Sequence, residues 1–284
     1  QDVVIAAGVE SMTRVPMGSN FKLHEQAGLG TGPWSDAIKN RYGVAEFSQF
    51  TGAQMIADKW GFTRGQLDAY AFESHSRAAA ATEAGAFDDE IIGLAVDGPQ
   101  GSGERHLRDE GIRYDASLEG IGSVKPLQDG GTITAANSSQ ICDGAAAILV
   151  VNDLAVKQHN LTPIARVHGL TVTAGDPVMM LAEPIRATRV ALDKAGLSIN
   201  DIDLFEVNEA FASVPLAWLQ ELKADPTKLN VNGGAIALGH PLGGTGAKLM
   251  TTLVHALRAR GARWGLQTMC EGGGIANVTI VEAL

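Results

Sequence analysis

The chain has 284 residues, of which 45% are hydrophobic and 19% charged, enough for one large domain or two smaller ones. Its formal net charge of −10 disfavours nucleic acid and anionic membrane surfaces as partners. Two cysteines give no disulfide framework, no apolar run has the length of a membrane helix, and no basic segment marks a signal peptide, so we expect a reduced, cytoplasmic protein.

The first half of the chain begins with an apolar segment, residues 2–8, which predicts a buried strand. Because this strand starts at once and without a methionine, we expect the chain to begin within a domain. Residues 15–50 are rich in Gly, Ser, Pro and Asn and predict irregular structure. Capping-box patterns at residues 51–54 and 63–66 predict helices that end near residues 61 and 85. Residues 86–135 then predict short strands and loops.

The second half alternates strand and helix patterns more regularly. The strands expected here are residues 145–151, which look fully buried, and 164–170, 202–207, 265–269 and 276–281. The helices expected are residues 184–195, with Pro at the start and Gly196 after the end, a helix that ends near 222 and another that ends near 260. This alternation predicts a layered α/β fold. Residues 3–10 also resemble residues 266–272, which indicates two similar halves.

Asn208, His240 and Cys270 each follow a predicted strand or lie in a strand-to-helix turn. Because ligands gather beyond the carboxyl ends of strands in open α/β sheets, these side chains are candidates for one site. A histidine can remove a proton near neutral pH, a thiol can donate or accept one, and an amide can polarise an oxygen. The glycines after Cys270 leave N–H groups free to stabilise an oxyanion, so the set suits acyl or carbanion chemistry.

A structural interpretation competes with this one, because isolated cysteines are among the most buried side chains. Cys142 is interpreted as inert, since a buried strand follows it directly. The other histidines, which lack a partner pattern, are interpreted as surface or packing residues: His24, His75, His106, His159, His168 and His255. No Cys/His spacing predicts a metal site. The glycine-rich loop at residues 231–246 is neither a P-loop nor a dinucleotide fingerprint.

Five ordered motifs resemble those of the thiolases, which make or cleave 3-ketoacyl-CoA. They are AGVESM at residues 7–12, DGAAA at 143–147, NEAFA at 208–212, GHP at 239–241 and CEGGG at 270–274. Together they span the whole chain. Residues 11–17 look more similar to the degradative acetyltransferases of the family than to the biosynthetic ones.

The resemblance implies a role for each motif. His240 would activate a nucleophilic cysteine that carries the acyl group, and Cys270 would exchange the proton at the substrate α-carbon. Asn208 would hold a water that binds the thioester oxygen together with His240, and the Gly272 N–H would contribute to a second oxyanion hole. The substrate-binding residues implied are Phe211, near the pantetheine arm, with Gly239 and Gly273. The basic residues expected to meet the CoA phosphates are Arg105, Arg108, Arg113 and Lys125.

The resemblance also implies a thiolase-like layered fold of αβαβα type. Residues 1–12 and 144–158 would be the remnant of an incomplete N-terminal domain, residues 13–143 an inserted loop domain that covers CoA, and residues 159–284 a complete C-terminal domain. Two departures stand out. The motif of the nucleophilic cysteine is absent, which predicts that this chain alone is inactive, and Gly169 replaces a serine that contacts CoA in many members.

We therefore expect an acyltransferase of fatty acid β-oxidation that cleaves 3-ketoacyl-CoA with CoA, or runs the reverse condensation. Its partners would be acyl-CoA and CoA as substrates, with no cofactor, metal, nucleic acid or membrane, and it would form a homodimer or homotetramer. One alternative is a non-catalytic acyl-CoA or lipid-binding protein of the same fold. Another is a Cys-His-Asn hydrolase built on Cys270, His240 and Asn208.

Overall fold

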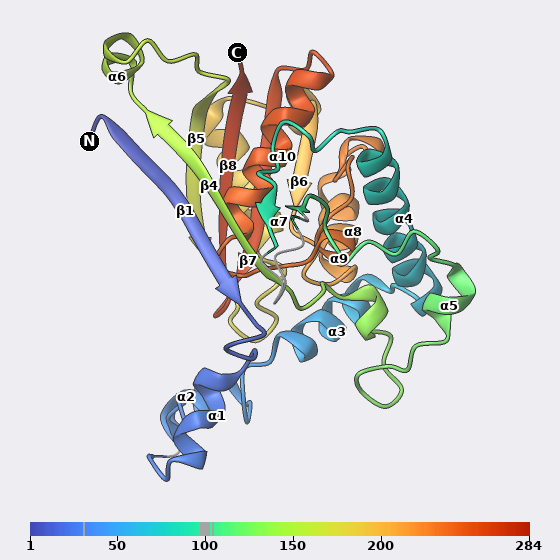
Figure 1. Ribbon diagram of the computed structural model, residues 1–284. Helices are drawn as coiled ribbons and strands as arrows, with labels where there is room; N and C mark the ends of the chain where they lie inside the picture. The colour runs from blue at the N-terminus through green and yellow to red at the C-terminus, as the bar shows by residue number, and fades with distance from the viewer. Residues whose placement is uncertain (31, 97–102, 104) are drawn as a thin grey trace.

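The computed structural model describes residues 1–30, 32–96, 103 and 105–284 (Figure 1). Its strands are β1 Val3–Ser11, β2 Leu94–Ala95, β3 Arg105–His106, β4 Asp143–Val151, β5 Ala165–Ala174, β6 Leu204–Val207, β7 Trp264–Glu271 and β8 Ile275–Ala283. Its α-helices are α1 Ser19–Gln26, α2 Asp36–Tyr42, α3 Gln49–Trp60, α4 Arg64–Glu83, α5 Leu118–Gly122, α6 Asp153–Gln158, α7 Glu183–Ala195, α8 Ser213–Leu222, α9 Ala235–Leu238 and α10 Thr245–Ala259. Short 3₁₀ turns occur at η1 Ala135–Asn137, η2 Ile199–Asp201 and η3 Pro226–Lys228.

The described elements stack in layers, which confirms the layered α/β prediction (Figure 1). A central sheet has the strand order β5-β8-β7-β6, in which β6 and β7 are parallel and the other neighbours antiparallel. Helix α7 packs against one face of this sheet with α8 beside it, and α10 packs against the other face. The antiparallel pair β1–β4 lies on the far side of α10. Helix α10 is therefore enclosed between two β layers.

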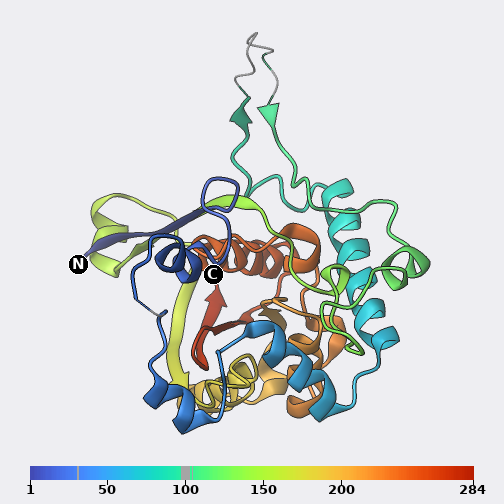
Figure 2. The ribbon, with the colours of Figure 1, turned by 90° about the horizontal axis from the view of Figure 1, so that it is seen from below.

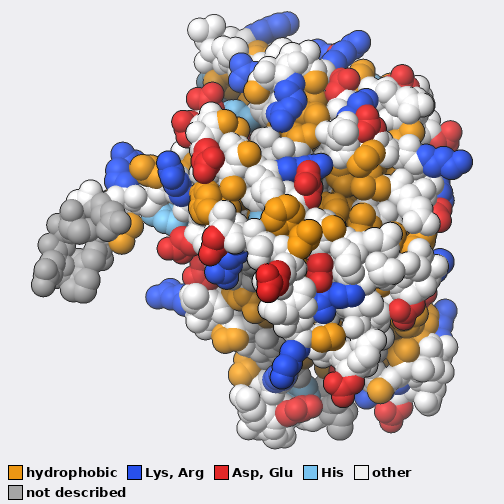
Figure 3. Space-filling view, turned by 90° about the vertical axis from the view of Figure 1, so that its right-hand side faces the viewer, with side chains coloured by type: hydrophobic (Ala, Val, Ile, Leu, Met, Phe, Trp, Pro, Cys, Tyr) orange, Lys and Arg blue, Asp and Glu red, His pale blue; other side chains and the backbone are white. Residues whose placement is uncertain are grey.

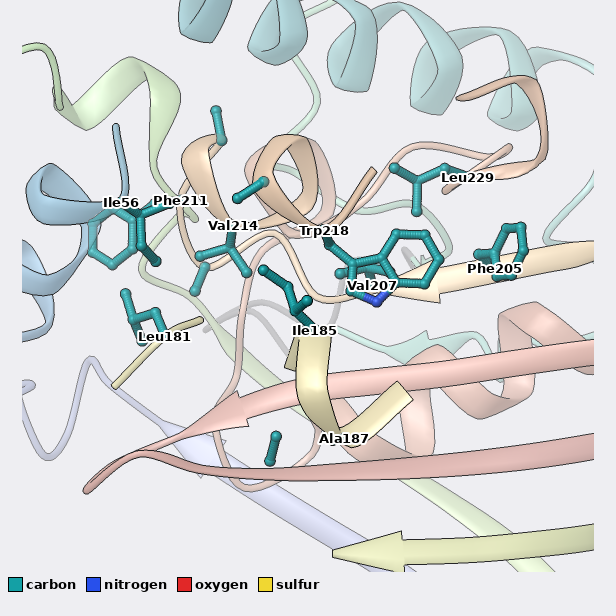
Figure 4. Packing of buried hydrophobic residues seen from close by; sticks show 14 of the residues in the cluster. Ile56, Leu181, Ile185, Ala187, Phe205, Val207, Phe211, Val214, Trp218 and Leu229 are labelled. Carbon is teal, nitrogen blue, oxygen red and sulfur yellow. The ribbon is translucent and has the colours of Figure 1, made fainter. Parts of the chain in front are cut away.

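The main core lies between the central sheet and α7, α8 and α3 (Figure 4). Trp218 of α8 is fully buried, packs edge-on against Phe205 of β6 at 5.0 Å and donates its indole N–H to Thr188 of α7 at 2.9 Å. This hydrogen bond satisfies the indole N–H, which would otherwise be buried at a cost in free energy. This core supports the β6 strand that leads into Asn208.

The cap signals predict helix ends well. Thr63 and Gln66 form the predicted capping box of α4, and α7 has Pro184 in its first turn and ends at Gly196 in the left-handed conformation. The cap predicted at residue 51 is wrong, because Ser48 caps α3 and Thr51 lies inside the helix.

The prediction of irregular structure for residues 15–50 is also wrong, because α1 and α2 form there. Neither helix has a buried residue, so the apolar periodicity that marks a core helix is missing. Instead, Trp34 contacts Phe21 and Phe47 at ring distances of 5.5 and 5.9 Å, which holds the segment together through aromatic packing. The short helices α5 and α6 were likewise not expected from the sequence.

The predicted burial of the β1 and β4 strands is a further error. In β1 residues 3–7 and Val9 are exposed and Gly8 is half-buried, and β4 mostly alternates between exposed and half-buried residues. Both sequences are continuously apolar, which is typical of strands covered on two faces, but only the face toward α10 is covered here. Cys142 therefore precedes an exposed strand, not a buried one.

The β2–β3 pair extends from the body of the molecule (Figure 2). Residues 97–102 and 104, within the segment predicted as short strands and loops, lie outside the described residues. On the face that carries α4 and α5, lysines and arginines are interspersed with acidic and apolar side chains (Figure 3). None of the helices in the described part of the chain is both long and apolar enough to cross a membrane.

Candidate active site

The predicted site residues lie at the carboxyl edge of the parallel strands β6 and β7. Asn208 follows β6 directly, and its backbone N–H donates to the Thr268 carbonyl of β7 at 3.1 Å. Cys270 is two residues further along β7, paired with Ala276 of β8. His240 reaches the same edge from the loop between α9 and α10. The topology thus brings the three predicted residues to one edge of the sheet, and a hydrogen bond joins the side chains of Asn208 and His240 there.

Hydrogen bonds assign the tautomer of His240. The Thr245 hydroxyl donates to the Pro241 carbonyl at 2.8 Å and lies 2.7 Å from Nδ1 of His240. Because its single hydrogen is used on Pro241, the hydroxyl accepts from His240, which puts the imidazole proton on Nδ1. Nε2 is then an acceptor and receives the Asn208 Nδ2–H at 3.3 Å. The imidazole presents a basic lone pair toward Asn208.

Burial and, as a smaller effect, the nearby Lys248 ammonium together lower the pKa of His240 from 6.5 to about 4. The imidazole is therefore neutral at pH 7, the form that a general base requires. The Oδ1 atom of Asn208 is buried and has no hydrogen-bond partner among the described residues, so it can accept a hydrogen bond.

Cys270 is partly buried against the core, and desolvation raises its pKa to about 12. At neutral pH the thiol is protonated, so it suits the donation of a proton better than nucleophilic attack. Among the hydrogen bonds of the described residues, none joins Cys270 to His240. The two groups share an edge of the sheet without forming a Cys–His pair.

The glycines of the site differ in their surroundings. A Cβ on Gly272 or Gly273 would meet no atom within 4 Å, so the backbone there is open to an approaching group. Gly239 has φ +80°, and a Cβ on it would lie 2.5 Å from the Cys142 sulfur. Residue 239 therefore has to be a glycine so that the chain can turn into His240 against Cys142.

Phe211 is buried and packs edge-on against Phe50 of α3 at 5.7 Å. Together with His240 it lines a cavity of about 50 Å³. The other lining residues are mostly apolar or amide: Met12, Met17, Gln49, Phe50, Ser138, Ser139, Gln140, Ile141, Ala210 and Leu242. The segments before α1 and around α3 thus meet the C-terminal site residues here.

Cys142 lies beside the backbone N–H of His240. Burial raises the pKa of its thiol, although Lys248 and the His240 N–H act in the opposite direction. The thiol of Cys142 is therefore mainly protonated at neutral pH, which agrees with the interpretation of this cysteine as unreactive. The original reason for that interpretation, a buried strand directly after Cys142, does not hold, because β4 is partly exposed.

Glu209, whose role the sequence analysis missed, anchors the site from behind. Its carboxylate is buried and accepts four hydrogen bonds, at 2.7 to 3.1 Å, from Tyr70 and Ser74 of α4, from Asn230 and from the Ile236 N–H. It thereby ties α4 to the loop that carries α9 and His240. An acidic residue among apolar ones was the available sign of this role in the sequence. A buried carboxylate is stable only when hydrogen bonds satisfy its oxygens.

His75 and His168, predicted as surface or packing residues, both have packing roles. His75 is buried, accepts the Arg113 N–H at 3.2 Å and has its pKa lowered to about 4 by burial and then by Arg113. His168 packs against Trp264 with ring centroids 4.7 Å apart.

A larger cavity of about 330 Å³ lies between α4 and α8, away from His240 and Cys270. Its polar groups Tyr70, Glu209 and Asn230 are already bonded to one another. No cluster of three or more His, Cys, Asp or Glu side chains in the described part of the chain has the geometry to hold a metal ion.

Comparison with known proteins gives matches over both parts of the chain. The family model described as thiolase, N-terminal domain, matches residues 1–153, and that described as thiolase, C-terminal domain, matches residues 161–283. The chain is 52% identical over 285 residues to the steroid 3-ketoacyl-CoA thiolase FadA6 of Mycobacterium tuberculosis, which covers 100% of this chain and 68% of that protein. It is 38% identical over 294 residues to the mitochondrial 3-ketoacyl-CoA thiolase of Homo sapiens, which covers 99% of this chain and 72% of that protein.

Solved structures agree with these matches. The crystal structure of human mitochondrial 3-ketoacyl-CoA thiolase superposes with a TM-score of 0.86 at 38% identity, covering 100% of this chain and 72% of that chain. The same human enzyme in complex with CoA gives a TM-score of 0.84 at 37% identity, covering 100% of this chain and 71% of that chain.

Proposed function

Because this chain belongs to the thiolase family, and is an enzyme chain of the thiolase type, we propose that it takes part in thiolytic cleavage of a 3-ketoacyl-CoA by CoA. The observation that carries the proposal is the neutral His240, whose Nε2 lone pair faces Asn208 at the strand edge where Cys270 also lies.

In the proposed reaction an acyl-carrying cysteine gives its proton to His240 and its sulfur attacks the 3-keto carbon. The C2–C3 bond then breaks, and C2 takes up the proton of Cys270 to leave as acetyl-CoA. CoA then gives its thiol proton to the Cys270 thiolate and its sulfur attacks the acyl carbon, and the released cysteine regains its proton from His240. A thiol whose pKa is about 12 holds its proton until a strongly basic carbon appears, which suits Cys270 to the second step.

Negative charge develops on a substrate oxygen at two points of this proposed reaction. We assign the enolate oxygen to His240 and Asn208, and the oxyanion of the tetrahedral intermediate to the Gly272 N–H, which lies in an open turn. Phe211, Gly239 and Gly273 are proposed to contact the substrate. CoA is proposed as a substrate, and the inserted segment 13–143 as its cover.

Neither cysteine of residues 1–284 suits the acyl-carrying role. The pKa of each thiol is raised, and neither is hydrogen-bonded to the His240 imidazole among the described residues. We therefore propose that neither Cys142 nor Cys270 carries the acyl group. A polypeptide of residues 1–284 alone should bind CoA weakly and turn over no acetoacetyl-CoA.

The test uses the protein as its gene encodes it, with acetoacetyl-CoA and CoA as substrates. His240→Ala and Cys270→Ala should each lower kcat by about a thousandfold, the scale of a lost acid–base group. His159→Ala, which removes an exposed histidine outside the site, is the matched control and should leave kcat unchanged.

A second readout separates the two roles. In deuterated water, Cys270→Ala should stop the exchange of the methyl hydrogens of acetyl-CoA. Tight CoA binding without any turnover by the wild-type protein would instead support a non-catalytic acyl-CoA-binding protein. Ester hydrolysis lost on alkylation of Cys270 would support the Cys-His-Asn hydrolase.

A further inference from the structure

Helix α9 is a single turn whose end leads directly into His240, and the carbonyl groups of residues 236–239 accept hydrogen bonds from side chains outside the helix. The Gln140 side chain donates to the Ile236 and Ala237 carbonyls at 2.7 and 3.2 Å. The Lys248 ammonium donates to the Leu238 and Gly239 carbonyls at 2.8 and 3.2 Å. The last carbonyl groups of a helix have no partner within it, so these two side chains complete α9.

The position of Lys248 is unusual for a cation. It lies in the first turn of α10, where the helix dipole disfavours positive charge. The carbonyl groups at the C-terminal end of α9 carry the opposite partial charge and offset that cost. The ammonium group thus bridges the end of one helix and the start of the next, directly across the turn that holds His240.

We propose that Lys248 is the positioning residue of His240: its ammonium holds the two carbonyl groups that precede the imidazole and places one positive charge across the turn from it. Only the expected effect of Lys248 on catalysis rests on the proposed function. The structural part, the coupling between Lys248 and His240, stands on the hydrogen bonds to the two carbonyl groups before His240.

Several other titratable groups surround this ammonium and the imidazole. Those that act on them or on their neighbours are Glu90 after α4, Glu206 of β6, Asp109, Arg260 after α10, Glu10 of β1 and the Cys142 thiol. Burial raises the pKa of Glu90 to about 7 and raises that of Glu206 as well. Near pH 7 Glu90 therefore carries only part of its negative charge, and Glu206 holds its proton more tightly than a free carboxyl group does.

The experiment measures the protonation of His240 directly. Diethyl pyrocarbonate modifies only the neutral imidazole, and peptide mass spectrometry gives its rate at His240 from pH 5 to 8 in the protein as its gene encodes it. In the wild type the rate constant, corrected for reagent decay, should stay flat down to pH 5. Lys248→Met should raise the apparent pKa of His240 by about one unit or more, so that the rate falls below pH 6. Lys248→Arg, which keeps the charge, should restore the flat profile.

Activity gives a second, separable readout. Lys248→Met should lower kcat by about tenfold with KM for CoA within about twofold, since a displaced base affects the chemical step more than binding. Lys194→Met, which removes an exposed lysine from the end of α7, is the control for loss of one positive charge. If the wild type has no thiolase activity, the proposed function fails while the modification profile still tests the coupling.

Two results would overturn the inference: a Lys248→Met profile that superimposes on the wild type, or a folded Lys248→Arg that behaves like Lys248→Met. If Lys248→Met does not fold by circular dichroism, Lys248→Gln replaces it, because the amide N–H₂ group keeps the ability to donate hydrogen bonds without the charge. A flat Lys248→Gln profile would then refute the proposed role of the charge.

Discussion

The tautomer of His240 depends on one hydroxyl group, that of Thr245. Thr245→Val keeps the shape of the side chain but removes the acceptor of the Nδ1–H bond and the donor to the Pro241 carbonyl. We expect kcat to fall by about tenfold or more, because the imidazole loses the bond that orients it, with a loss of about 1 kcal/mol in stability. Steady-state thiolysis and thermal unfolding check both values. Thr245→Ser restores the hydroxyl and should restore activity; equal losses in the valine and serine variants would refute the tautomer assignment.

Glu209 also depends on its hydrogen-bond partners. Four groups donate hydrogen bonds to its carboxylate. Glu209→Gln places an amide N–H₂ against those donors, so at least one donor loses its acceptor and two N–H or O–H groups oppose each other. We expect a loss of about 2–4 kcal/mol in the free energy of unfolding. Chemical denaturation measures it, with the exposed Glu83→Gln as the control. A loss below about 0.5 kcal/mol would mean that the site does not depend on this anchor.

At the scale of elements, the sequence predicted best where local chemistry decides. Thr63, Gln66, Pro184 and Gly196 act within one turn of their own helix, and each did what its pattern predicts. The polar residues at strand ends were likewise found at one edge, because parallel pairing of β6 and β7 brings their carboxyl ends together. The Glu209–Ser74 contact joins segments 135 positions apart in the chain, and the Lys248 contact crosses from one helix to the end of another, so no pattern within a single helix encodes either.

The contact between the segment after α4 and α10 carries a pH dependence. Glu90 accepts the Thr252 hydroxyl at 3.0 Å, and burial raises its pKa from 4.5 to about 7. The folded state therefore binds this proton more tightly, so the contribution to stability is fully present below pH 4.5 and is lost as the pH rises through about 7.

Glu90→Gln mimics the neutral acid and keeps an acceptor for Thr252. We expect it to match the wild type near pH 5 and to be more stable by on the order of 2 kcal/mol at pH 8.5. Urea unfolding at the two pH values measures the difference, and Glu83→Gln should show no pH-dependent gain. A Glu90→Gln variant that is destabilised more at pH 8.5 than at pH 5 would show that the ionised form stabilises the fold.

At the scale of the whole molecule, the β1–β4 pair accounts for the largest error in predicted burial. Alternate residues of β1, including Val3, Ile5 and Val9, point away from α10, and the register places Leu149 of β4 on the same face. Ile5 is 70% and Val9 71% exposed. The continuous apolar residues of β1 and β4 are typical of strands covered on both faces. Among the described residues, α10 covers only one face of this pair. A sequence pattern specifies that a face is apolar but not which part of a protein covers it.

This uncovered face determines how a polypeptide of residues 1–284 should behave in isolation. An exposed apolar sheet face with a free β1 edge favours association through strand pairing and apolar contact. We expect concentration-dependent self-association in sedimentation velocity and strong binding of an apolar dye. The double variant Ile5→Lys and Val9→Lys should remove most of both, whereas Ile92→Lys, at a residue 85% exposed elsewhere, should change neither. A monodisperse wild-type polypeptide that unfolds in one reversible transition would show that the face is compatible with water.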